Sequence, residues 1–274
     1  MNTSVERAAA EQKDASDLLA VFRASFFIPP REDGSDSIYL CGHSLGLQPR
    51  GVGRIFAEEL EHWAELGVEG HFASSRPWLP YHEQLTGSLA RLVGGMTTEV
   101  IAMNSLTVNL HLMLASFYRP RPGREAIVIE KRAFSSDQYA VESQVRHHGF
   151  DPQTALIAIA PREGEDTLRT EDICALIDRE GARIATVMLG GVQYLTGQRF
   201  DIEAITRCAR RHGCSVGFDL AHAIGNVPLR LHDWGVDFAV WCSYNYLTAG
   251  PGAIGGCFIH DRHARSPNTP RFAG

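Results

Sequence analysis

The sequence contains little lysine, no excess of positive charge and no long apolar run. Its 274 residues hold 26 Lys and Arg against 32 Asp and Glu, a net charge of −6, so the basic surface typical of nucleic-acid-binding proteins is lacking. No stretch reaches the length of about 18 apolar residues that a membrane span needs, and the first residues lack the apolar segment of a signal peptide. We therefore expect a cytoplasmic protein that binds a small molecule, without nucleic-acid or membrane partners.

The cysteines also lack the spacing of a metal site or a redox motif. Six are scattered along the chain, at positions 41, 174, 208, 214, 242 and 257, without a CxxC pair or a Cys/His cluster. Several lie in apolar strand-like segments. We expect reduced cysteines inside the core and no bound metal.

Short apolar segments alternate with helical patterns over most of the chain. Strands are predicted at 100–103, 126–129, 155–159, 184–189, 215–218, 238–241 and 253–259, and helices at 106–118, 136–147, 171–178 and 202–212. Before them we expect helices at 5–26, 51–66 and 81–93 and a short extended segment at 38–41. This alternation predicts an α/β fold with a mostly parallel sheet covered on both faces, and a ligand at the carboxyl ends of its strands.

Two polar clusters each follow a predicted strand and begin a predicted helix. Asn104 to Thr107 would present a capping side chain and free backbone N–H groups, which is the usual arrangement of a phosphate site. Phe134 to Asp137 also starts a helix, with Ser135 or Ser136 as the cap, and the Phe134 ring could lie against a planar ligand. Each cluster alone also fits an ordinary helix cap.

Asp219 ends an apolar strand, where a carboxylate needs a cationic or hydrogen-bonding partner. The protonated ring nitrogen of pyridoxal phosphate (PLP) would supply one, and His222 lies close enough in sequence to support it. About two dozen residues later comes an aromatic turn with Tyr244 and Asn245, followed by glycines that allow close backbone approach. Core packing of Tyr244 and a locally satisfied His222 are the alternative interpretations.

The motifs that carry these residues resemble kynureninase, a fold type I PLP enzyme related to the class V aminotransferases. The resemblance rests on ordered segments that cover nearly the whole chain: 42–49, 70–78, 103–111, 134–139, 191–197, 217–226, 231–239 and 241–256. It implies hydrolysis of L-kynurenine or 3-hydroxykynurenine to anthranilate or 3-hydroxyanthranilate and L-alanine, in tryptophan catabolism and NAD biosynthesis. It also implies a homodimer.

The resemblance also implies a division of the chain and a role for each site residue. Residues 1–70 would form an N-terminal helical segment with a substrate loop, and residues 71–274 an incomplete PLP-binding large domain whose small C-terminal domain is missing. Leu106 and Thr107 would hold the phosphate, Phe134 would stack on the ring and Ser135, Ser136 and Asp137 would flank it. The remaining roles would be Asp219 at the ring nitrogen with His222 beside it, Tyr244 as phosphate contact and acid/base, and Ser44 and His71 in the substrate pocket.

One position departs from this pattern. Asn245 occupies the place of the lysine that bonds to the cofactor and moves protons in this family, and an amide nitrogen has no basic form near neutral pH. The chain has two lysines, Lys13 and Lys131, and neither matches that position. We therefore weigh kynureninase activity against a catalytically inactive PLP- or ligand-binding homologue. A cysteine desulfurase or selenocysteine lyase fits less well, since no cysteine lies in a recognisable catalytic loop.

Overall fold

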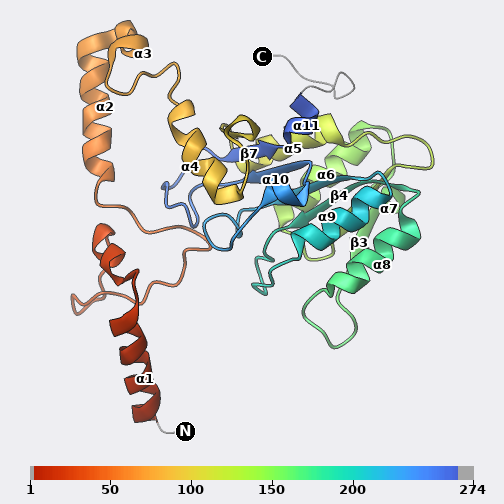
Figure 1. The fold of residues 1–274 in the computed structure, drawn as a ribbon, viewed down its shortest axis with the longest axis horizontal. Helices are drawn as coiled ribbons and strands as arrows, with labels where there is room; N and C mark the ends of the chain where they lie inside the picture. The colour runs from red at the N-terminus through yellow and green to blue at the C-terminus, as the bar shows by residue number, and fades with distance from the viewer. Residues whose placement is uncertain (1–2, 265–274) are drawn as a thin grey trace.

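One sheet forms the centre of the molecule in residues 3–264, the part of the chain that the computed structural model describes (Figure 1). Its seven strands lie in the order β1-β7-β6-β5-β4-β2-β3. Their bounds are β1 Val100–Ala102, β2 Ala126–Glu130, β3 Leu156–Ile159, β4 Ile184–Gly190, β5 Ser215–Asp219, β6 Phe238–Trp241 and β7 Gly256–Ile259. Neighbouring strands are parallel except where β7 pairs antiparallel with β1 and β6. The predicted mostly parallel sheet is confirmed.

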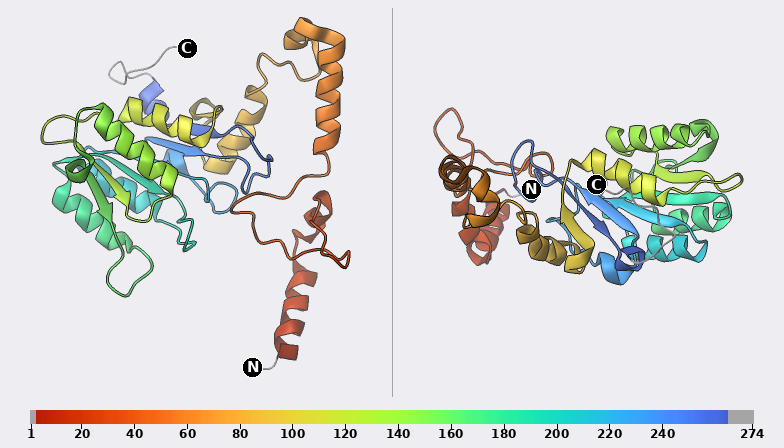
Figure 2. Two further views of the ribbon diagram at one scale, coloured as in Figure 1. Left: turned by 180° about the vertical axis from the view of Figure 1, so that it is seen from behind. Right: turned by 90° about the horizontal axis from the view of Figure 1, so that it is seen from above.

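Helices cover both faces of the sheet, as the views in Figures 1 and 2 agree. On one face lie α5 (Leu106–Phe117) and α6 (Ser135–His147), and on the other lie α8 (Thr170–Glu180) and α9 (Ile202–Arg211). In strand β2, successive side chains point to opposite faces of the sheet. Ile127 and Ile129 pack into the core under α5 and α6, whereas Val128 points into the core under α8 and α9. Fully buried apolar strands of this kind need helices on both sides.

The shorter helices connect these layers and extend the chain at both ends. Those near the sheet are α4 (Glu83–Val93), η3 (Thr97–Glu99), α7 (Pro152–Ala155), α10 (Leu231–Trp234) and α11 (Asp261–Ala264). The N-terminal part holds α1 (Thr3–Ser16), η1 (Ala20–Ser25), α2 (Val52–Leu66), η2 (Gly67–Glu69) and α3 (Gly70–Ala73). Figures 1 and 2 show α1, α2 and α3 standing away from the sheet and its covering helices.

This N-terminal part exposes many large apolar side chains. They include Leu18, Leu19, Val21, Phe22, Ile38, Leu40, Phe56, Leu60, Trp63, Val68, Phe72 and Leu79. On α2, Phe56, Leu60 and Trp63 recur at helical spacing and are each at least 60% exposed, so the predicted apolar face of this helix exists but is uncovered.

Three expectations from the sequence are wrong. The helix expected over 5–26 ends at Ser16, where the Asp17 carboxylate accepts the Leu19 N–H and turns the chain. Neither Ser135 nor Ser136 caps α6, because Phe134 is its N-cap residue and no side chain bonds to the free N–H groups there. Cys174 on α8 and Cys208 on α9 form a disulfide, so these two cysteines are not reduced. Among the described residues, no helix is long and apolar enough to span a membrane.

Candidate active site

A cavity of about 410 Å³ opens at the carboxyl ends of the parallel strands. Four connections supply most of its wall: the start of α5 after β1, the start of α6 after β2, the end of β5, and the loop after β6. Segment 43–44 from the N-terminal part and residues 194–195 after β4 complete the lining. The position agrees with the rule that α/β sheets bind ligands beyond the carboxyl ends of their strands.

Most of the residues singled out in the sequence meet in this cavity. Nine line it: Ser44, Leu106, Thr107, Phe134, Ser136, Asp219, His222, Tyr244 and Asn245. Asp137 is buried and its carboxyl interacts with that of Asp219, and Ser135 is the first residue of α6. His71 is not among the lining residues. It lies on α3, where its ring packs edge-on against Trp78 at 5.5 Å between centroids.

Three buried carboxyl groups converge beneath the cavity: Glu130 at the end of β2, Asp137 on α6 and Asp219 at the end of β5. Burial raises the pKa of all three, and the charge of Asp219 raises the pKa of Asp137 further. Asp219 Oδ1 accepts the backbone N–H of Ala221 at 2.7 Å. Within residues 3–264 no Arg, Lys or His side chain forms an ion pair with these three groups, so no basic side chain neutralises them. A protonated nitrogen beside Asp219 would supply it.

Asn245 is buried on the wall of the cavity, with 4% of its surface exposed. Its Nδ2 donates to the carbonyl oxygen of Ala221 at 3.2 Å, while its Oδ1 has no hydrogen-bond partner. A buried polar atom without a partner is rare and costs about 1–3 kcal/mol. Neither lysine substitutes for the missing amine, since Lys131 lines a separate small cavity with Glu130 and Lys13 lies on α1.

The start of α5 presents backbone donors to the cavity. Ser105 is the N-cap residue and its hydroxyl accepts the Val108 N–H at 3.5 Å, which confirms the predicted capping role of this turn. Leu106 and Thr107 are the first helical residues and line the cavity, and the N–H groups at this position of a helix have no intrahelical partner. With the helix dipole they form a suitable place for an anionic group.

Aromatic rings also line the cavity. Phe134 precedes α6 as its N-cap residue, and its ring stands edge-on to Tyr194 at 5.2 Å between centroids. Tyr194 also approaches His222 at 6.3 Å, and burial lowers the pKa of His222. Burial raises the pKa of Tyr244 to about 12, so its hydroxyl is protonated at neutral pH. The sequence interpretation did not single out Tyr194 as a site residue, although it lies within the quoted segment 191–197.

A backbone contact brings the N-terminal segment 42–46 to the cavity. The Gly46 N–H donates to the carbonyl oxygen of Tyr244 at 2.8 Å. A Cβ atom on Gly46 would lie 2.4 Å from the backbone oxygen of Asn245 and 2.6 Å from Thr248, so glycine is required for this approach. The contact places His43 and Ser44 in the lining.

These features fit a flat, anionic aromatic ligand with a protonated ring nitrogen, which is the chemistry of PLP. The carboxyl group of Asp219 meets the nitrogen requirement, the start of α5 meets the phosphate requirement and Phe134 offers a face to the ring. They do not fit the covalent anchor of that cofactor, because Asn245 has no basic nitrogen.

Residues 38–266 match the class V aminotransferase family. The chain is 57% identical to kynureninase from Koribacter versatilis and 58% identical to kynureninase from Myxococcus xanthus, in each case over 97% of this chain and 62% of the relative. Kynureninase from Nematostella vectensis is 50% identical over 98% of this chain and 60% of the relative. The chain thus spans about three fifths of the length of these relatives.

Solved structures show the same fold at low sequence identity. The cystine C-S lyase C-DES superposes with a TM-score of 0.70 and 18% identity, covering 86% of this chain and 60% of that chain. A cysteine desulfurase from Thermococcus onnurineus gives a TM-score of 0.66 and 18% identity, with 82% and 54% covered. Because the family match covers residues 38–266 and this architecture agrees with it, the chain belongs to the class V aminotransferase family.

Proposed function

We propose that this chain carries the cofactor and substrate site of a kynureninase, which uses PLP to hydrolyse L-kynurenine or its 3-hydroxy form. Two observations together support this proposal. The chain is 50–58% identical to kynureninases over nearly all its length, and its cavity gathers nine of the residues that the family motifs single out. The products would be anthranilate, or its 3-hydroxy form, and L-alanine, with one water consumed.

Different residues of the cavity would bind the phosphate, the ring and the ring nitrogen of PLP. Leu106 and Thr107 would donate backbone N–H groups to the phosphate, and Phe134 would lie against the ring, with Ser135 and Ser136 beside it. Asp219 would keep a proton on the ring nitrogen, and Asp137 would lower the mobility of that carboxyl. Bound PLP withdraws electrons from the α-carbon of an amino-acid substrate, which is the chemistry that this cleavage needs.

Tyr244 and His222 are placed to handle the substrate side. The Tyr244 hydroxyl holds its proton at neutral pH and lines the cavity, so it can donate to the γ-carbonyl oxygen of kynurenine as a general acid. Ser44 also lines the cavity and would offer a hydroxyl to the substrate, and His222 would support the edge near Asp219. For His71 a substrate contact stays a prediction that requires α3 to approach the cavity.

Asn245 favours a second candidate, a site that binds without turnover. Its amide can neither bond to the aldehyde carbon of PLP nor accept the α-proton of the substrate. A lysine-to-alanine variant of C-DES was solved with glycine covalently linked to PLP. By analogy, this chain would hold PLP together with an amino acid even though the lysine is missing, and release product slowly or not at all.

A three-variant comparison separates the two candidates. The natural chain, Asn245→Lys and Asn245→Met are each titrated with PLP and then with L-kynurenine, while anthranilate fluorescence is recorded. Methionine matches lysine in length but has no amine. We expect all three to bind PLP, and Asn245→Lys alone to gain the visible absorption band of lysine-bound cofactor and to release anthranilate. Turnover by the natural chain would refute the role assigned to Asn245, and failure of all three to bind PLP would refute the cofactor site.

We also propose that two copies of this chain associate in the cytoplasm, and that residues 1–70 form a unit distinct from 71–274. The support is the uncovered face of α2, where Phe56, Leu60 and Trp63 are at least 60% exposed. Sedimentation of the natural chain and of Phe56→Glu/Trp63→Glu tests the dimer. Arg54→Glu, on the other face of the same helix, is the control that should leave association unchanged. A natural chain that sediments as a monomer would refute the proposal.

A further inference from the structure

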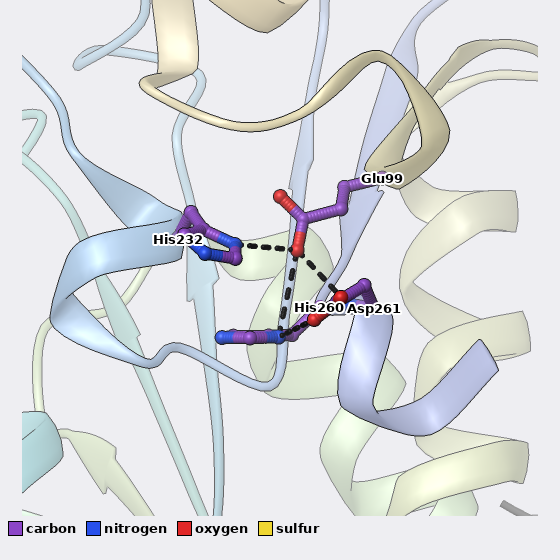
Figure 3. A group of neighbouring side chains, drawn as sticks. All are labelled: Glu99, His232, His260 and Asp261. Atoms are coloured by element: carbon purple, nitrogen blue, oxygen red, sulfur yellow. Dashed lines mark hydrogen bonds and ion pairs between the residues drawn. The ribbon is translucent and has the colours of Figure 1, made fainter. Parts of the chain in front are cut away.

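Four side chains with metal-binding atoms meet at the edge of the sheet opposite the cavity. They are Glu99 from η3, His232 from α10, His260 directly after β7 and Asp261 at the start of α11 (Figure 3). This edge is where β6 begins, because Phe238 pairs with Ile259, whereas the cavity lies where β5 and β6 end. The kynureninase resemblance assigns no role to these residues, and the proposed function does not involve them.

We propose that these four side chains form a binding site for one divalent transition-metal ion, with Zn²⁺ the best match. The donor set of two imidazoles and two carboxylates is one that zinc accepts in four-coordinate sites. The four donor atoms lie within 4.8 Å of one another. The proposal is independent of the chemistry at the cavity.

The spacing of the donor atoms suits a metal. Glu99 Oε1 lies 2.9 Å from His232 Nδ1 and 3.5 Å from His260 Nδ1, and His260 Nδ1 lies 2.9 Å from Asp261 Oδ1. Ligands bonded to Zn²⁺ at about 2.0–2.1 Å in a tetrahedron are about 3.3 Å apart. The three observed separations lie close to this value, and all four donor atoms lie within 4.8 Å of one another, so small side-chain movements would bring them into coordination.

His260 Nδ1 has three polar neighbours. It accepts the backbone N–H of Arg262 at 3.3 Å. The same nitrogen lies 3.5 Å from Glu99 Oε1 and 2.9 Å from Asp261 Oδ1, so possible metal ligands from three segments of the chain converge here. A divalent ion would bind these atoms together, with the imidazole in its neutral form.

His232 supplies the fourth donor. Its Nδ1 lies 2.9 Å from Glu99 Oε1, in a hydrogen bond that the metal would replace. Two neutral imidazoles and two carboxylates then balance the charge of a divalent ion. The His232 and His260 rings are stacked with their centroids 4.7 Å apart, and the Nδ1 atoms of both lie near Glu99 Oε1 (Figure 3).

The surroundings of Glu99 hold its carboxylate in place. Its side chain is fully buried, the Met96 N–H donates to Oε2 at 2.8 Å and the Asp261 N–H donates to Oε1 at 2.8 Å. Asp261 and His232 are 47% and 34% exposed, which leaves a path from solvent for the ion. A metal here would tie η3, α10 and the end of β7 together and stabilise the fold.

Equilibrium dialysis against micromolar Zn²⁺, followed by elemental analysis, tests the site. We expect one tightly held Zn²⁺ per natural chain and loss of it in His232→Asn/His260→Asn. The loss should exceed the roughly 10- to 100-fold weakening caused by removing only an outer partner of a metal ligand. His147→Asn/His148→Asn removes an adjacent histidine pair elsewhere and should keep the ion. A natural chain without Zn²⁺, or a cluster variant that binds as tightly as the control, overturns the proposal.

A second measurement needs no variant, in case the double substitution prevents folding. The natural chain is loaded with Co²⁺ and its visible spectrum recorded, because four-coordinate Co²⁺ absorbs far more strongly than the hydrated ion. We expect this strong absorption at one equivalent, its loss on adding Zn²⁺, and a rise in the unfolding temperature with either metal. Weak absorption like that of hydrated Co²⁺ would overturn the site, whatever the behaviour of the variant.

Discussion

Substitution of Gly46 by alanine tests how segment 42–46 is coupled to the cavity. The added Cβ would lie 2.4 Å from the backbone oxygen of Asn245, well inside the separation that a carbon and an oxygen tolerate. The next nearest atoms belong to Thr248, whose Cα would lie at 2.8 Å, so rotating a flexible side chain cannot relieve the strain. Overpacking of this kind costs typically about 1–3 kcal/mol. If that strain is relieved when segment 42–46 leaves the cavity, PLP should bind roughly 5- to 150-fold more weakly.

The assay is a PLP titration followed by absorbance, together with thermal unfolding. Gly42→Ala is the matched control, because its Cβ would meet only the Tyr246 ring at an ordinary 3.6 Å. We expect Gly42→Ala to bind PLP as the natural chain does. Equal PLP affinity and equal unfolding temperature for Gly46→Ala and the natural chain would refute the coupling between this segment and the loop that carries Asn245.

Three further predictions concern buried carboxyl groups. Asp237 accepts from Arg262 and His263, both at 2.6 Å, so Asp237→Asn should lose about 3–5 kcal/mol and lower the unfolding temperature by roughly 6–20 °C in calorimetry. Burial alone would raise the pKa of Asp237, but these partners lower it overall. The ionised Asp237 therefore contributes its full stabilisation of the fold above pH about 4, and this contribution is lost as the pH falls through the lowered pKa. In an acid titration of stability, Asp237→Asn should lack this pH dependence. Burial raises the pKa of Asp219, so its ionised form destabilises the cofactor-free protein at neutral pH. Asp219→Asn should therefore unfold at a higher temperature and yet bind PLP more weakly. A variant in which stability and PLP affinity both rise, or both fall, would contradict the role assigned to Asp219.

The strands and the main helices could be predicted from the sequence because their apolar patterns are local. The run 238–241 is buried throughout as β6, and the helix expected at 136–147 begins one residue earlier as α6. The helix expected over 5–26 shows the opposite case. Its apolar spacing is helical, but α1 ends at Ser16 because the Asp17 carboxylate accepts the Leu19 N–H and competes with the helical hydrogen bonds.

The candidate site was predictable where its residues follow strands, and less so where distant segments meet. Asp219 and Phe134 follow β-strand patterns directly, so the carboxyl-edge rule brings them together. The approach of Ser44 depends on a long connection, whose path is fixed by tertiary contacts such as the one between Gly46 and Tyr244. Likewise the cluster of Glu99, His232 and His260 joins residues more than a hundred positions apart, and no spacing rule would reveal it.

The pairing of β1 with β7 has a consequence for the order in which the protein is made. Val100 lies opposite Phe258, although the two are far apart in sequence, whereas β2 to β6 pair with strands nearer along the chain. During synthesis on the ribosome, β1 therefore has no strand to pair with until the ribosome has released β7, which ends at residue 259. Because loop closure over such a distance is slow, this step should come last in folding and leave the growing chain open to chaperones until then.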